Sequence, residues 1–130
     1  PRDGSEAERE CRARSPSTYL PDARGHDVRV LVATGIDDWF VPPAHALKAF
    51  NALAEPAERL DADEIGAISA EGRVPPGLEE GAENRMFEAA GEELLLEVES
   101  GQVVLWVFEG SHDVVYNAGL VWLAEQGGAR

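Results

Sequence analysis

The sequence predicts an α/β layer fold with a parallel β-sheet, and three observations indicate it. A run of apolar and β-branched residues, VRVLVAT at 28–34, lies between Gly25 and Gly35 and is typical of a buried strand. A segment with helical apolar spacing follows. Apolar runs at 93–99 and 103–109 then return to strand character before a second helical segment. Alternating strands and helices are the pattern of a sheet covered by helices.

The leading segment, residues 1–27, is polar and charged. Its stretch SEAERECRAR at 5–14 consists largely of helix formers and predicts a short helix. Ser15-Pro16 should end that helix, because a residue before proline is pushed out of the helical conformation. The segment contains neither the apolar core of a signal peptide nor a run long enough for a membrane span. Cys11 is the only cysteine, which excludes a disulfide within the chain.

The first strand should lead into a helix that begins at Pro42-Pro43, since proline is favoured in a first helical turn. Its apolar face consists of Leu47, Phe50, Leu53 and Ala54. Residues 55–92 are acidic, with few large apolar groups, and predict a surface insertion. One short helix is expected in it, starting at Asp61 with Glu64 three positions later.

The C-terminal part returns to regular structure. The runs on either side of Ser100-Gly101 predict either a β-hairpin or two successive strands. A final helix over 114–126 should end at Gly127-Gly128. Its predicted buried face consists of Val114, Ala118, Val121 and Trp122.

The predicted strands and helices are too few for a complete α/β domain, because the buried strand 28–34 would need a neighbouring strand on each side. We therefore expect the chain to be part of a larger domain whose N-terminal strands lie outside these 130 residues. The formal net charge of −14, from 25 acidic and 11 basic residues, argues against nucleic acid and an anionic membrane as partners. It is typical of a surface that keeps a protein in solution.

Two polar clusters follow the predicted strands. Asp37 and Asp38 come after the strand 28–34, and His112 comes after the strand 103–109. Sites in open α/β sheets gather at the carboxyl ends of strands, so neighbouring parallel strands would bring a carboxylate and an imidazole together. Such a carboxylate accepts a hydrogen bond from the Nδ1–H of the histidine, and Nε2 can then take a proton from a hydroxyl. The other interpretations are a loop-capping Asp38 and a buried His112 with a backbone partner.

A nucleophile is not evident in the sequence. There is no G-x-S-x-G element; Ser69 lies in GAISAEG, which has the wrong spacing, and Ser111 adjoins His112. No compact ligand spacing supports a metal site built from Asp37, Asp38 and His45, and no cofactor is expected.

Three motifs stand in order along the chain. They are SP-x-x-Y at 15–19, V-x-V-L-V-A-T-G-x-x-D-x-x-V-P-P at 28–43 and F-E-G-S-H at 108–112. On these motifs, residues 14–126 resemble the C-terminal part of prolyl-oligopeptidase-type α/β-hydrolases. The stretch at 49–65 is also similar to bacterial α/β-hydrolases with a long insertion before the histidine, and AFNAL has a looser likeness to acetylxylan-esterase-type hydrolases.

The resemblance implies a serine hydrolase, a peptidase or carboxylesterase, that acts on ester or peptide substrates through an acyl-serine intermediate. It identifies Asp38, rather than Asp37, as the acid that orients His112, and it places the serine upstream of residue 1. This chain alone should then be inactive. Trp39 and Phe40, beside Asp38, either line a substrate pocket or cover the sheet edge. The alternative function is a non-catalytic α/β interaction module whose acidic insertion binds a partner protein.

Overall fold

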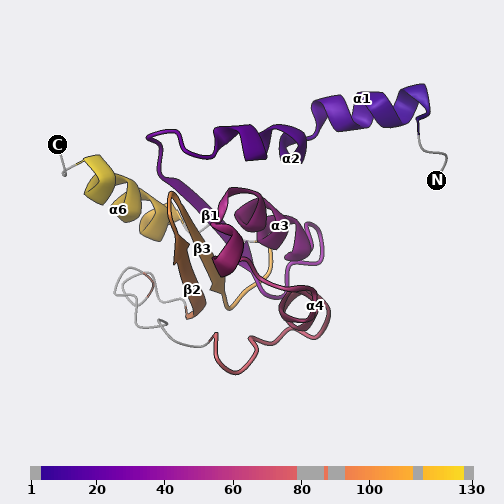
Figure 1. The fold of residues 1–130 in the computed structure, drawn as a ribbon. Coiled ribbons are helices and arrows are strands. Elements are labelled where there is room, and N and C mark those ends of the chain that lie inside the picture. The colour runs from indigo at the N-terminus through magenta and orange to yellow at the C-terminus, as the bar shows by residue number, and fades with distance from the viewer. Residues whose placement is uncertain (1–3, 79–86, 88–92, 113–115, 128–130) are drawn as a thin grey trace.

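The computed structural model describes residues 4–78, 87, 93–112 and 116–127. Three strands and several helices make up this part of the chain (Figure 1). In chain order they are α1 (Glu6–Arg14), α2 (Pro16–Tyr19), the 3-10 turn η1 (Leu20–Ala23), β1 (Val30–Gly35), α3 (Ala44–Leu53), the 3-10 turn η2 (Pro56–Glu58), α4 (Ala62–Ala70), β2 (Leu94–Ser100), β3 (Val103–Phe108) and α6 (Tyr116–Gly127).

The described strands form one mixed sheet in the order β1-β3-β2. β1 pairs with β3 in parallel, from Val30 opposite Val103 to Gly35 opposite Phe108. β2 is antiparallel to β3, so the two form the hairpin that the sequence left as one of two alternatives. Gly101 in the turn has φ of 54°, a conformation that glycine adopts without strain. The expected parallel sheet is therefore only partly correct, since one of its two pairings is antiparallel.

Both faces of the sheet are covered, and β3 is buried throughout. Its residues alternate between two hydrophobic clusters, as the two-residue period of a strand requires. Val103, Leu105 and Val107 lie in the cluster that contains the buried side chains of α3 and α4. Val104, Trp106 and Phe108 lie in the cluster with Phe87 and the buried side chains of α6. The chain thus has helix, sheet and helix layers (Figure 1), a general α/β arrangement.

The segment 55–92 contributes to the core, which corrects the expectation of a surface insertion. Leu60, Ala67 and Ile68 are buried, because α4 packs its apolar side under the sheet. The predicted helix start is confirmed: the Asp61 carboxylate accepts from the N–H of Glu64, and the Glu64 carboxylate accepts from the N–H of Asp61. Residues 79–86 and 88–92 lie outside the described part of the chain.

The two long helices against the sheet match the sequence to different degrees. The buried face of α3 is confirmed, with Leu47, Phe50, Leu53 and Ala54 all in the core. In α6, Ala118 and Trp122 are buried as predicted, whereas Val121 is 45% exposed. Ala118 and Trp122 are four positions apart and form a narrow buried stripe on the helix. Val121 lies next to this stripe. Val114 lies outside the described residues.

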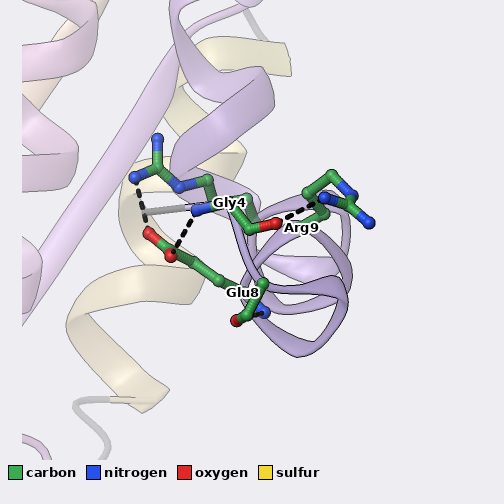
Figure 2. A network of polar contacts seen from close by, with 5 residues as sticks. Gly4, Glu8 and Arg9 are labelled. Atoms are coloured by element: carbon green, nitrogen blue, oxygen red, sulfur yellow. Dashed lines mark hydrogen bonds and ion pairs between the residues drawn. The ribbon is translucent and has the colours of Figure 1, made fainter. Parts of the chain in front are cut away.

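The leading segment forms helices that add little to the core. α1 runs from the N-cap Ser5 to Arg14 and ends at Ser15 before proline, as predicted. Figure 2 shows how its first turn is held: the Glu8 carboxylate accepts from the N–H of Gly4, and the Arg9 guanidinium donates to the carbonyl of Gly4. α1 has no buried residue. None of the described helices is both long and apolar enough to cross a membrane.

Candidate active site

Parallel pairing of β1 and β3 brings the two predicted polar clusters to the same edge of the sheet. Gly35 and Phe108, the last residues of the two strands, are paired. The loops that follow stay together, because the N–H of Ile36 donates to the Phe108 carbonyl and the N–H of Asp37 donates to the Gly110 carbonyl, both at 2.9 Å. The two loops therefore stay side by side up to the residues that carry the functional side chains.

Gly35 makes this close approach possible. A Cβ atom at this position would lie 2.2 Å from the carbonyl oxygen of Ser111 and 2.5 Å from that of Gly110. Both contacts are with backbone, so a side chain could be admitted only by moving the loop that carries His112. The glycine thus allows the loop after β3 to cross the end of β1.

Asp38 meets His112 at this edge. Oδ2 of Asp38 lies 2.9 Å from Nδ1 of His112. The other carboxylate oxygen, Oδ1, accepts from the N–H of Phe40 at 3.0 Å and of Val41 at 2.8 Å. The carboxylate therefore caps its own loop and also orients the imidazole, so the capping and pairing interpretations of Asp38 both hold.

The electrostatics of Asp38 favour its ionised form. Its side chain is only 9% exposed, and this burial acts to raise the pKa of the carboxyl group. The hydrogen bond from the Val41 N–H, the hydrogen bond and charge of His112, and the bond from the Phe40 N–H together outweigh burial. The pKa of Asp38 is consequently lowered from its ordinary value of 3.8. An ionised carboxylate is thus present at neutral pH to accept a hydrogen bond from the Nδ1–H of His112.

The imidazole of His112 is held on one side and open on the other. Its side chain is 56% exposed, which contradicts the interpretation of a buried histidine. Nδ1 faces Asp38, and Nε2 has no hydrogen-bond partner among the described residues. An acceptor at Nδ1 favours the tautomer with the proton there, which leaves the Nε2 lone pair available as a base.

The remaining polar candidates do not join this pair. Asp37 is exposed, and its side chain makes no hydrogen bond or ion pair within the described residues. His26 and His45 are exposed as well. No group of three potential metal ligands is found in the described part of the chain.

None of the serines supplies a hydroxyl to His112 within the described part of the structure. The Ser69 hydroxyl donates to the Ile65 carbonyl at 2.8 Å inside α4. The Ser100 hydroxyl, 1% exposed, donates to Glu58, and Ser100 pairs with Val103 at the end of β3 opposite to the site. Ser111 directly precedes His112 and makes no hydrogen bond with it among the described contacts.

Two aromatic side chains stand beside the pair. Trp39 is 73% and Phe40 65% exposed, so neither packs into the core. Their ring centroids lie 3.8 Å apart, and the Phe40 ring lies 5.6 Å from the His112 ring. Trp106, Phe108 and Trp122, by contrast, are buried in the core.

Comparisons with protein-family models, with curated proteins and with solved structures find no match for this chain. Any function for the site therefore depends on its motifs and on its geometry.

Proposed function

We propose that this chain supplies the acid and the base of a serine hydrolase, a peptidase or carboxylesterase. The observation that carries the proposal is the 2.9 Å contact between Asp38 Oδ2 and His112 Nδ1 at the shared edge of two parallel strands. The His112 ring is exposed and its Nε2 has no hydrogen-bond partner among the described residues, which is the arrangement that a hydroxyl nucleophile requires. The resemblance to prolyl-oligopeptidase-type hydrolases points the same way.

In the proposed reaction His112 moves protons and Asp38 keeps the ring in place. Nε2 takes the proton from a serine hydroxyl as the oxygen attacks the acyl carbon, and the protonated ring then gives it to the leaving alcohol or amine. Water next attacks the acyl carbon while Nε2 takes a proton from it, the bond to the serine oxygen breaks, and the ring returns the proton to that oxygen as the acid is released. Asp38 stays ionised throughout and stabilises the imidazolium that forms in each half-reaction.

The serine and the donors of the oxyanion hole would come from a polypeptide segment outside these 130 residues. β1 lies at one edge of the described sheet and has a free side for another strand. Next to this edge lies a cleft of about 450 Å³. Its lining includes Val30 and Leu31 of β1 and Leu120, Trp122 and Leu123 of α6. Because Leu120 and Leu123 are 63% and 59% exposed, a strand and helix added here would bury apolar surface that this chain leaves open.

The same open edge and apolar cleft also suit the second candidate, a non-catalytic module that binds another protein. That function requires nothing of the Asp38–His112 contact. The two candidates therefore differ in whether disrupting the contact removes activity.

Fluorophosphonate labelling of the chain, alone and joined to the polypeptide encoded directly upstream of it, tests the proposal. The chain alone should remain unlabelled. The longer protein should be labelled at a serine outside these residues, and His112→Ala should abolish that labelling. His45→Ala is the matched control, because His45 is exposed and makes no hydrogen bond or ion pair with Asp38 or His112 among the described contacts. Labelling of a serine within this chain, absence of labelling in the longer protein, or labelling that survives His112→Ala would each contradict the proposal.

A further inference from the structure

We propose that Trp39 and Phe40 form an aromatic platform that binds the apolar part of the substrate, so that the hydrolase acts on esters or amides carrying an aromatic or bulky apolar group. This inference rests on the proposed function and names its substrate class. The two rings directly follow Asp38, the proposed catalytic carboxylate, in the sequence.

The platform is apolar surface that folding leaves uncovered. Trp39 and Phe40 have the exposures given above, and the next residue, Val41, is 48% exposed. The ring centroids lie 3.8 Å apart with 30° between the planes, so the two rings stack on each other and keep their outer faces and edges open to a ligand. Three adjacent apolar side chains that are exposed contribute little to the stability of the fold. A ligand that covers them removes their apolar surface from water, which favours binding.

The loop that carries the platform is held in place before any ligand arrives. Oδ1 of Asp38 accepts from the N–H groups of Phe40 and Val41, and Pro42 and Pro43 follow directly. Proline fixes the backbone φ angle, and the two hydrogen bonds hold the turn. A ligand that binds here therefore loses little free energy to ordering of the loop.

One carboxylate links the platform to the chemistry. Asp38 holds the platform through Oδ1 and His112 through Oδ2. The Phe40 and His112 ring centroids are 5.6 Å apart, with 51° between the planes. A substrate group packed on Phe40 would thus place a carbonyl group a few bonds away within reach of the imidazole.

Charge around the platform favours an uncharged ligand. Asp37 and Asp38 adjoin it, and the whole chain has a net charge of −14. No lysine or arginine contacts Trp39 or Phe40 among the described ion pairs and ring contacts. A carboxylate or phosphate on the apolar group would therefore be disfavoured.

The platform is separate from the cleft beside α6. The first residues of β1 line that cleft, whereas Trp39 lies in the loop after Gly35, the last residue of β1. A six-residue strand spans roughly 20 Å, so a segment that pairs with the start of β1 can leave the platform open to substrate.

Benzyl acetate and ethyl acetate serve as the probes, titrated separately into the 130-residue chain and followed by amide and imidazole NMR. Benzyl acetate should give saturable shifts at Trp39, Phe40 and His112, and ethyl acetate at the same concentrations should not. Trp39→Ala should weaken benzyl acetate binding about five- to tenfold. Leu120→Ala, which alters an exposed apolar residue of the α6 cleft, should leave benzyl acetate binding unchanged.

Saturation confined to α6 residues, equal shifts for both esters, or unchanged binding in Trp39→Ala would overturn the platform. None of these results depends on a nucleophile. The platform can therefore fail while fluorophosphonate labelling succeeds, and the converse also holds.

Discussion

Gly35→Ala should break the Asp38–His112 pair without touching either residue. The new Cβ would stand 2.2 Å from the Ser111 carbonyl oxygen and must be separated from it to at least 3.0 Å. The loop that carries His112 would have to move by that difference. Added to the present 2.9 Å, such a shift takes the Oδ2–Nδ1 distance beyond the hydrogen-bond range, which ends at about 3.2 Å. Overpacking of this kind costs roughly 1–3 kcal/mol of folding free energy.

Urea unfolding followed by circular dichroism measures the change in stability, and imidazole ¹⁵N NMR reports on the pair. Gly66→Ala is the matched control, because Gly66 lies inside α4 with open space where a Cβ would be. It should raise the free energy of unfolding by about 0.5–1 kcal/mol through helix propensity. A Gly35→Ala protein that is as stable as the parent and shows unchanged His112 signals would refute the steric reasoning.

Three further predictions follow from the described contacts. In the proposed hydrolase, Asp38→Asn should reduce turnover by roughly 10⁴-fold, as loss of the triad acid does in other serine hydrolases, whereas Asp37→Asn should change turnover little. Steady-state kinetics measure both variants, and a larger loss in Asp37→Asn would identify Asp37 as the acid instead. Ser100→Ala removes a buried hydroxyl that donates to Glu58 at 2.6 Å and accepts from the N–H of Glu55 at 2.8 Å, so urea unfolding should show a loss of about 1–3 kcal/mol. The lowered pKa of Asp38 means that its carboxylate stabilises the fold above the ordinary value of 3.8 and that this contribution is lost as pH falls through the lower folded value. The stability difference between the parent and Asp38→Asn should therefore narrow at acid pH, and a difference that stays constant from pH 6 to pH 2 would contradict this.

Local patterns predicted the elements whose signals lie within a few residues. The run before Gly35 is a strand, the four apolar positions of α3 are buried, and Asp61 and Glu64 form the predicted cap. The geometry of the pair was also predictable, because parallel neighbours must end at one edge.

Other features depend on contacts between distant segments and were not readable. The acidic composition around Leu60 and Ile68 indicated a surface segment, although these two side chains are buried in the core. The antiparallel placement of β2 depends on which strand it pairs with, and its own apolar pattern does not specify the direction. In α6 apolar residues surround the helix, so periodicity could not show that Val121 stays exposed.

The ¹⁵N chemical shifts of the neutral His112 ring test the central claim most directly. If Asp38 holds the imidazole as described, the proton lies on Nδ1 and Nε2 has the shift of an unprotonated ring nitrogen. Asp38→Asn should abolish that preference, and Asp37→Asn should preserve it. A proton found mainly on Nε2, or a tautomer mixture identical in the parent and Asp38→Asn, would show that no base is prepared at this edge of the sheet.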